Sequence, residues 1–583
     1  MFSSTACYNF ARGTTIVTAT LTGAEVLAAS ALTFFASPII ISYFSDRVFA
    51  AISPALVLAA SLAATVAMAT WLNRRARWHA DETGAVLSLM AIVFAWLLWV
   101  ARPAFVPLGH GPDLTHHLLL VDFIARRWQL PHDPAMEGYL GEFFHYTPGA
   151  HLLTSLAGAW LHVGGFRAAH PVLAATVTLK AGFVFLVALR IRMSVPIALA
   201  AVFLSLAPQA YAFGSFTHDF FFAQVTAELF AVALWWAIAA WDDGVRTGAL
   251  ELAALAGAAT FLTWPIWIGP LLLMFALVVF FRESISVRER VVALVMAAGP
   301  VAVVAAIYLA GRIGWLSIVR TTGGVTWPTP STTGWLLPLL ALPGLVIAVP
   351  RRSARTTVVL IAAIAAQAAA LFAVAGRSPS DTPYMALKMM YLAVYPVAVC
   401  GALALEEGAA KAGHYVRGVR LPPSRKATAD RRSPGGGGQA DPVRIQASTA
   451  WLFAAILIAV VGRDVARTPR DTPVVSLPLF RAGEWARDHV PPGCIEYLVG
   501  NADTAYWLHL AVLGNPRASA RTADVETFDE RHALMRWIDR GEFPYAIADL
   551  TTVPRDVRDA SDVLVQFDTA AVLKRRGAAR HCG

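Results

Sequence analysis

The sequence predicts a mainly α, polytopic transmembrane protein with about 13 membrane-spanning helices and a small α/β domain at its C-terminal end. Of its 583 residues, 57% are hydrophobic and only 15% are charged, whereas a soluble globular chain carries about a quarter charged residues. The apolar residues come in runs of about twenty, the length that crosses roughly 30 Å of hydrocarbon. After residue 463 charges become frequent and short apolar runs alternate with turns. We therefore expect a bilayer around most of the chain and water around its last part.

The predicted spans share a length close to that of a bilayer-crossing helix and contain few charges. They cover residues 22–44, 48–72, 85–105, 171–190, 195–213, 222–241, 246–264, 265–281, 291–310, 334–349, 356–376, 388–405 and 448–463. Residues 147–164 are also apolar, but counting them as a span would move Arg190 and Arg192 to the outside. We therefore expect a re-entrant or interfacial helix there, entered through Pro148 and Gly149.

Basic residues orient these spans. Arg and Lys cluster in short loops that all fall on one side of the membrane, and these loops are residues 73–77, 190–192, 282–290, 351–355 and 411–444. By the positive-inside rule this side is the cytoplasm. The net charge of +9 lies largely in these loops, and no long basic stripe with interleaved aromatics is present. We therefore expect no nucleic-acid partner.

This topology divides the chain into four parts. Residues 1–405 form a transmembrane module whose long external loop covers residues 106–170, and residues 406–447 form a basic, glycine-rich cytoplasmic linker. Residues 448–463 form the last transmembrane helix, and residues 464–583 form an extracytoplasmic domain.

Two cysteines, Cys494 and Cys582, fall in this external domain. In an oxidising compartment they are expected to form a disulfide, and the alternative is two unrelated thiols.

The external loop contains a dense set of polar residues. Pro112 and Asp113 mark a helix start, and the apolar residues that follow form one stripe, made of Leu114, Leu118, Val121 and Ile124. Asp113, His116 and His117 would share a face in the first turn of a helix that lies along the membrane interface. A carboxylate there could act as the general base for an acceptor hydroxyl. Alternatively, Asp113 only caps the helix, and the histidines are interfacial polar residues.

Two arginines, Arg126 and Arg127, end the same predicted helix. Their guanidinium groups match the oxygens of a lipid phosphate, or else they only anchor the helix at headgroup depth. Further along the loop, Glu142, His145 and Tyr146 add polar side chains at the membrane surface. Each of these either contributes to substrate binding or is an ordinary solvated residue.

Two more external segments carry candidate residues. His218 and Asp219 lie between two predicted spans, and Tyr384 precedes Lys388 by one helical turn at the external start of another span. Lys388 either binds a phosphate or extends to the interface as an anchor. Because ionisable groups at the membrane usually mark a functional site, the common side of all three segments predicts one shared site.

These residues resemble motifs of the GT-C superfamily of polytopic glycosyltransferases, which includes protein O-mannosyltransferases, aminoarabinose transferases and arabinofuranosyltransferases. The resemblance rests on Asp113 in the first external loop and on residues 146–153, Tyr-Thr-Pro-Gly-Ala-His-Leu-Leu. Asp219 and the Tyr384-x-x-x-Lys388 run look like later features of such enzymes. The resemblance implies an inverting transfer of a sugar from a polyprenyl-phosphate donor to an envelope acceptor on the external face. Asp113 matches the catalytic Asp of the family.

The same resemblance implies a multi-pass protein of the bacterial plasma membrane, in contact with membrane lipids. The sequence departs from the family pattern in three ways. Two spans precede the usual first one, His116 and His117 replace the more common acidic neighbour of the catalytic Asp, and the external domain is small.

Two other function classes remain open on the sequence. A secondary transporter or lipid flippase would place substrate groups near mid-membrane, but the predicted spans hold few charges, chiefly Glu25, Lys180 and Glu228. A non-catalytic assembly partner would keep the fold without the chemistry of the loop.

No cofactor is firmly implied by the sequence. Nucleotide-binding glycine motifs are absent, which favours a lipid-linked donor over a nucleotide sugar. His116, His117, His132 and Asp113 are suitable metal ligands by type, so a divalent metal stays open. Their spacing matches no closed site, and we therefore assign no metal ligands.

Overall fold

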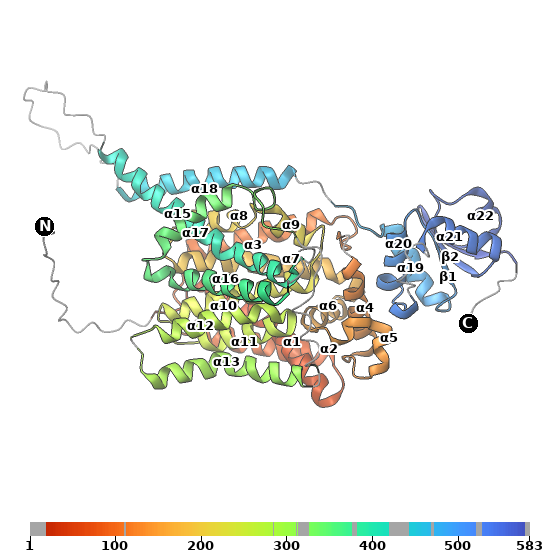
Figure 1. Cartoon of the computed structure of the whole chain (residues 1–583), viewed down its shortest axis with the longest axis horizontal. Coiled ribbons are helices and arrows are strands. Elements are labelled where there is room, and N and C mark those ends of the chain that lie inside the picture. The colour runs from red at the N-terminus through yellow and green to blue at the C-terminus, as the bar shows by residue number, and fades with distance from the viewer. Residues whose placement is uncertain are drawn as a thin grey trace, which may run out of the picture.

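The computed structural model describes residues 19–109, 112–283, 285–310, 312, 326–375, 382–418, 442–467, 471–519 and 528–577. Most of these residues are helical. The helices up to residue 467 gather in one bundle, and the C-terminal domain, coloured blue, lies beyond one end of that bundle (Figure 1). The predicted class, a polytopic helical protein with a small mixed C-terminal domain, is confirmed.

A helix matches each of the thirteen predicted spans. The helices of the bundle are α1 (Gly23–Phe49), α2 (Pro54–Asn73), α3 (Ala80–Val100), α7 (Gly165–Arg190), α8 (Val195–Leu204), α9 (Gln209–Phe216), α10 (Phe222–Asp242), α11 (Ala249–Thr263), α12 (Ile268–Phe280), α13 (Val287–Leu309), α15 (Leu336–Ala348), α16 (Arg355–Ala375), α17 (Tyr384–Gly418) and α18 (Pro442–Arg467). Among the described residues, nine helices are long and apolar enough to cross a membrane. Helices α8 and α9 together cover one predicted span and are bent by 74° at their break. The remaining three, α11, α12 with the turn before it, and α15, are shorter apolar helices.

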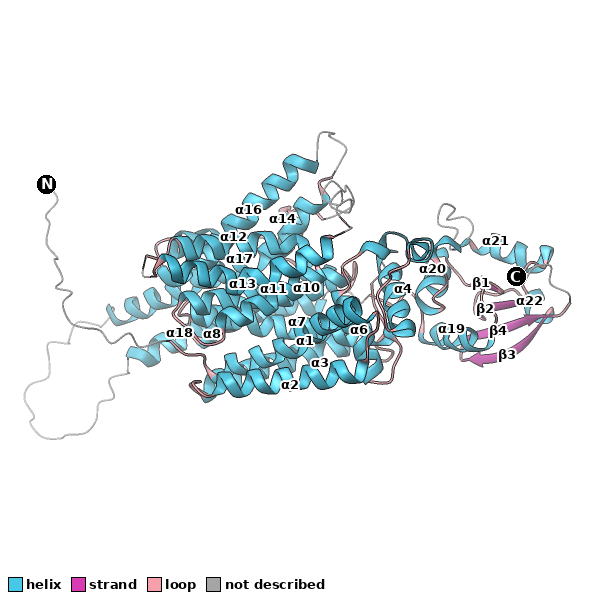
Figure 2. Cartoon of the chain, turned by 90° about the horizontal axis from the view of Figure 1, so that it is seen from below, coloured by secondary structure: helices cyan, strands magenta, loops and turns pink. Residues whose placement is uncertain are grey.

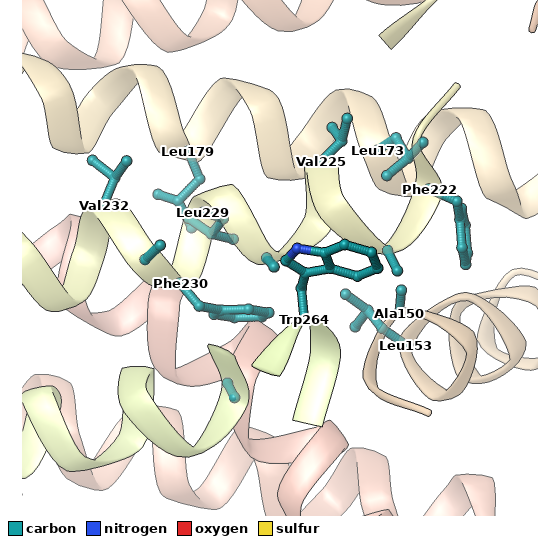
Figure 3. Close-up of a cluster of buried hydrophobic side chains, with 14 of the residues drawn as sticks. Ala150, Leu153, Leu173, Leu179, Phe222, Val225, Leu229, Phe230, Val232 and Trp264 are labelled. Carbon is teal, nitrogen blue, oxygen red and sulfur yellow. The ribbon is translucent and has the colours of Figure 1, made fainter. Parts of the chain in front are cut away.

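Helix α10 lies at the centre of the bundle. Every residue from Phe222 to Trp241 is buried, as expected of a helix that is apolar on all sides and surrounded by protein. It packs against α7 and α11, and Figure 3 shows side chains of this core around Trp264. By contrast, α2 and α13 expose large apolar side chains such as Leu56 and Val295. These outer helices present the surface that a bilayer would cover.

Residues 106–170, which the sequence predicts to be the external loop, form three helices and several turns. These helices are α4 (Pro112–Arg127), α5 (Glu137–Leu140) and α6 (Gly149–Trp160). Helix α4 begins at Pro112 as the sequence predicts, and its predicted apolar stripe is buried. Helix α6 begins at Gly149, as expected, and has only 12 residues, too few to cross the bilayer. Because α4 contacts both α6 and the C-terminal domain, it is buried on most of its surface.

The C-terminal domain packs helices against one four-stranded sheet. Its main elements are α19 (Leu477–His489), β1 (Ile495–Leu498), α20 (Ala502–Trp507), the π-helical turn η6 (Leu508–Val512), α21 (Glu530–Leu534), β2 (Tyr545–Asp549), α22 (Arg555–Asp559), β3 (Ser561–Phe567) and β4 (Ala570–Arg575). The strand order is β1-β2-β4-β3, with β1 and β2 parallel and the other pairs antiparallel. Figure 2 shows this sheet in magenta. The short apolar runs at residues 495–499 and 563–567 overlap β1 and β3.

Two predicted features extend beyond the described residues. Helix α17 continues to Gly418, past the predicted start of the linker at residue 406, and residues 419–441 are not described. Cys494 is disulfide-bonded, whereas its expected partner Cys582 lies outside the described residues. The pairing of these two cysteines therefore stays a prediction. Cys400 is a free, buried thiol in the bundle.

Candidate functional site

Asp113 lies close enough to side chains of several segments to act on them electrostatically. It is the second residue of α4, and it is exposed. Its charge acts on five groups of the external loop, of α17 and of the C-terminal domain, namely Tyr146, Tyr384, Lys388, Tyr506 and Arg517. The carboxylate that the sequence singles out therefore exerts its charge on residues that are distant in sequence.

A glycine allows the chain before α4 to approach the loop between α9 and α10. A Cβ atom at Gly109 would overlap the Cβ of Phe220 and would also meet the carbonyl oxygen of Thr217. Phe220 itself has a left-handed backbone with φ 47°, a conformation that is uncommon for a bulky residue. This close approach brings the segment that leads to Asp113 beside the loop that carries Asp219.

Lys388 is the buried cation of this site. The residue lies in the first turns of α17 and is 1% exposed. The Nζ atom lies 2.9 Å from the ring centroid of Phe221 and 5.0 Å from those of Tyr384 and Tyr391. Such cation–π contacts each contribute about 0.5–2 kcal/mol. The ammonium group is thus enclosed by aromatic rings.

The carboxylates that act on Lys388 lie further away. Asp219 and Asp113 both exert their charge on it, but among the described residues no Asp or Glu oxygen lies within the 4.0 Å of an ion pair. Burial raises the pKa of Asp219, while the charges of His218 and Lys388 lower it. An unpaired buried cation is costly, so this position is suited to an anion that arrives with a ligand.

A pair of histidines forms the inner wall beside Asp113. His117 Nδ1 lies 2.9 Å from His151 Nε2, and the rings of Phe143 and Tyr146 pack against His117 with centroids 4.6 and 5.0 Å away. Burial and the nearby His151 lower the pKa of His117 well below its usual value. Burial also lowers the pKa of His151 to about 3, so both rings are neutral near pH 7, and one can donate the hydrogen bond that the other accepts. The described residues contain no group of three metal-ligating side chains.

His116 points in another direction. Its Nε2 atom lies 2.6 Å from the hydroxyl of Tyr506 in the C-terminal domain, and burial followed by the charge of Arg517 lowers the pKa of His116 to about 4. The sequence predicted that Asp113, His116 and His117 share one face of α4. The two histidines instead diverge, His117 toward α6 and His116 toward the C-terminal domain, because adjacent residues of a helix do not face the same way.

Several predicted residues join this site and others do not. Glu142 forms an ion pair with Arg517, and Tyr146 is buried beside His117 with its pKa raised by burial. The site therefore contains most of the candidates. Those that it contains are Asp113, His116, His117, Glu142, Tyr146, Asp219, Tyr384 and Lys388.

Four candidates have other partners. Arg126 contacts Asp122 at 2.8 Å and donates to the carbonyl oxygen of Leu513 at 3.0 Å, so it holds the C-terminal domain. The remaining three have partners of their own: the Arg127 guanidinium lies 5.1 Å from the ring centroid of Phe123, His145 Nε2 lies 4.0 Å from Glu137, and His218 Nδ1 lies 3.8 Å from Asp471. The structure gives none of the four a contact with Asp113 or Lys388.

Sequence reasoning missed the partners that complete the site. Tyr506 and Arg517 come from the C-terminal domain, 390 residues after His116 in the case of Tyr506, and no local pattern marks them. Phe221 and Tyr391 enclose Lys388, but they look like ordinary apolar residues of spans. Of these partners, only His151 could have been found from the sequence, because it falls within the run of residues 146–153 that resembles the GT-C motif.

Comparisons with known proteins find similarity at the level of structure only. No family model matches the chain, and no curated protein matches it. The solved structures that resemble it include the apo oligosaccharyltransferase of Archaeoglobus fulgidus, with 14% identity and a TM-score of 0.46, covering 80% of this chain and 69% of that chain. They also include ArnT from Cupriavidus metallidurans bound to undecaprenyl phosphate, with 12% identity and a TM-score of 0.45, covering 84% of this chain and 98% of that chain.

Proposed function

We propose that this protein is a membrane glycosyltransferase that moves a sugar from a polyprenyl-phosphate-linked donor to an envelope acceptor on the external face. The observation that carries the proposal is the buried Lys388 ammonium, which has no described carboxylate partner and lies in the same charged cluster as the exposed Asp113. A buried cation beside a solvent-accessible carboxylate offers the two groups that such a transfer needs, one for the leaving phosphate and one for the acceptor hydroxyl.

The donor phosphate would bind at Lys388. Burying an ammonium group costs several kcal/mol, and the rings of Phe221, Tyr384 and Tyr391 offset only part of this cost. A phosphate oxygen would supply the missing counter-charge. Because Lys388 lies in the first turns of a membrane-spanning helix, a phosphate bound there would leave its lipid chain free to run along the bundle.

Asp113 would act as the base of the transfer. The acceptor hydroxyl oxygen forms a bond to the anomeric carbon of the sugar, and the bond from that carbon to the phosphate oxygen breaks. The hydroxyl proton passes to Asp113, and polyprenyl phosphate leaves with its added negative charge stabilised by Lys388. Attack from the side opposite the leaving group inverts the anomeric centre. Asp219 would help to keep Lys388 positively charged.

The second candidate class, a transporter or lipid flippase, has one specific observation in its favour. Lys180, Glu228 and Tyr395 form a buried polar cluster inside the bundle, with Nζ 2.7 Å from the phenol oxygen and that oxygen 2.5 Å from Glu228 Oε2. Ionisable residues inside a membrane often mark a transport path. This cluster is internally paired, however, whereas the buried Lys388 ammonium has no carboxylate partner among the described residues. We therefore favour transfer chemistry over passage through the bilayer.

The experiment that tests the proposal measures sugar transfer directly. The full-length protein in lipid nanodiscs is incubated with a panel of radiolabelled polyprenyl-phosphate pentoses and hexoses and with envelope fractions as acceptors. We expect transfer from one of these donors, and we expect its loss in Lys388→Met and Asp113→Asn. Arg576→Gln is the matched control, because it removes an exposed ion pair with Asp562 far from the site. Undiminished transfer by both site variants would overturn the proposed roles, and transfer of lipid across the bilayer with no new glycan would support the rival class.

A further inference from the structure

We propose that the C-terminal domain is a part of the active site, where Tyr506 and Arg517 complete the acceptor-side wall and select an uncharged, hydroxyl-rich acceptor. The proposal rests on the proposed function, because it assigns the acceptor of that same reaction. It starts from contacts between two parts of the chain that are far apart in sequence.

The C-terminal domain is held against the external loop by polar contacts. Arg487 donates to Asp122 at 2.5 Å and to the carbonyl oxygen of Val512 at 3.2 Å. The carbonyl oxygen of Gly514 accepts a hydrogen bond from Tyr139 at 2.6 Å. Gly514 has φ 64°, and a Cβ atom there would overlap the Asp122 carboxylate. The segment around Gly514 can approach α4 this closely only because Gly514 has no side chain.

This docking places two side chains of the domain against His116 of α4 and Glu142 of the external loop. The Tyr506 hydroxyl lies 2.6 Å from His116 Nε2, and the Tyr506 ring packs on Phe528 with centroids 5.7 Å apart. Arg517 forms an ion pair with Glu142 of the external loop, and it is half-buried. The charge of Asp113 acts on both Tyr506 and Arg517.

A second glycine makes room for Arg517. Gly141 has φ 62°, and a Cβ atom there would overlap the Arg517 guanidinium. The absence of a side chain at Gly141 therefore leaves space for the Arg517 side chain of the C-terminal domain. Contacts at both Gly141 and Gly514 show that the external loop and the C-terminal domain fit each other closely at two separate points.

The charges of this wall determine the ligand that suits it. The positive charge of Arg517 is balanced by Glu142, and His116 and the phenol of Tyr506 are neutral near pH 7. The wall therefore offers hydrogen-bond donors and acceptors without net charge. An anionic acceptor would find no free counter-charge in this wall, whereas the hydroxyl groups of a neutral carbohydrate could be matched. The phosphate site at Lys388 remains the only place in the described cluster with an unpaired positive charge.

The test compares acceptors and separates the acceptor from the donor. Envelope oligosaccharides are divided into a neutral and an anionic fraction, and the full-length protein in nanodiscs transfers radiolabelled sugar from its best polyprenyl-phosphate donor to each. We expect the neutral fraction to be labelled. Tyr506→Phe keeps the ring and removes only the hydroxyl, so we expect the acceptor KM to rise roughly three- to tenfold, the range of one lost hydrogen bond. We expect the donor KM to be unchanged.

A charge-balance rescue tests Arg517. Arg517→Gln leaves Glu142 unpaired and should raise the acceptor KM, whereas Arg517→Gln combined with Glu142→Gln restores neutrality and should return it to within about threefold of the parent, again within one hydrogen bond. Hydrogen exchange of α4 checks that the domain stays docked in each variant. Labelling of the anionic fraction alone, or an unchanged acceptor KM in Tyr506→Phe and Arg517→Gln, would overturn the inference while the transfer reaction stands. A parent protein that labels neither fraction from any donor would instead contradict the proposed function.

Discussion

Replacement of Lys388 by Met should change fold stability and donor affinity in opposite directions. The lysine is 1% exposed, and its ammonium is enclosed by the rings of Phe221, Tyr384 and Tyr391. Methionine has a similar length and no charge. Because apolar residues that replace buried charges are often neutral or stabilising, we expect the melting temperature of Lys388→Met to stay level or rise.

Donor affinity should fall at the same time. Two unit charges 4 Å apart attract by about 4 kcal/mol at an effective dielectric constant of 20, and every 1.4 kcal/mol corresponds to about a tenfold change in affinity. Partial desolvation of the phosphate reduces this, so we expect the donor Kd to rise by roughly two orders of magnitude. Lys411→Met is the matched control, because Lys411 lies on the same helix but is 76% exposed and pairs with Glu407.

The assay measures both quantities on the same preparations. Thermal unfolding in detergent gives stability, and quenching titration with a polyprenyl-phosphate sugar gives the donor Kd. A Lys388→Met protein that melts well below the parent but binds donor normally would refute the reasoning, since Lys388 would then be a structural residue rather than a phosphate ligand.

Three further predictions concern topology, the disulfide and pH. A cysteine placed at Asp562 should react with an impermeant reagent in intact cells and one at Gly436 should not; the reverse pattern would invert the topology. Cys494 and Cys582 should be bonded in protein purified without reductant, with stabilisation of about 4 kcal/mol for so long a loop; two free thiols by mass spectrometry would exclude this. Burial lowers the pKa of His116 to about 4 in the folded chain, whereas the pKa of a histidine in the unfolded chain is about 6.5. Between these two pH values the unfolded chain binds a proton that the folded chain does not bind. Folded stability should therefore fall by a few kcal/mol from about pH 6.5 to pH 4 and then level off; His116→Gln should flatten this dependence, and an unchanged pH profile would show that His116 does not cause it.

The sequence predicted the bundle well because each span is a local property. Length and hydropathy alone mark a bilayer-crossing helix, and all thirteen predicted segments are helical. The bend between α8 and α9 was not predicted, because residues 195–213 form one apolar run. It occurs near Pro208, which cannot donate the hydrogen bond that would continue the helix.

The site was predicted only in part. The predicted topology grouped Asp113, Asp219 and Lys388 on one side of the membrane, and in the structure both carboxylates act electrostatically on Lys388. The direction of side chains within α4 was wrong for His116, which faces the C-terminal domain. Tyr506 and Arg517 could not be predicted, since their positions depend on how a separate domain docks.

Transfer by Asp113→Asn tests the central claim most directly. Asparagine keeps the size of the side chain, and residue 113 is exposed in the first turn of α4, so the fold should survive, and donor binding at Lys388 should persist. Loss of a positioned general base typically costs a factor of roughly 10² to 10⁴ in rate. We therefore predict a folded, donor-binding Asp113→Asn protein whose transfer of radiolabelled sugar falls at least a hundredfold, whereas transfer near the parent rate would contradict the role of Asp113 in the reaction.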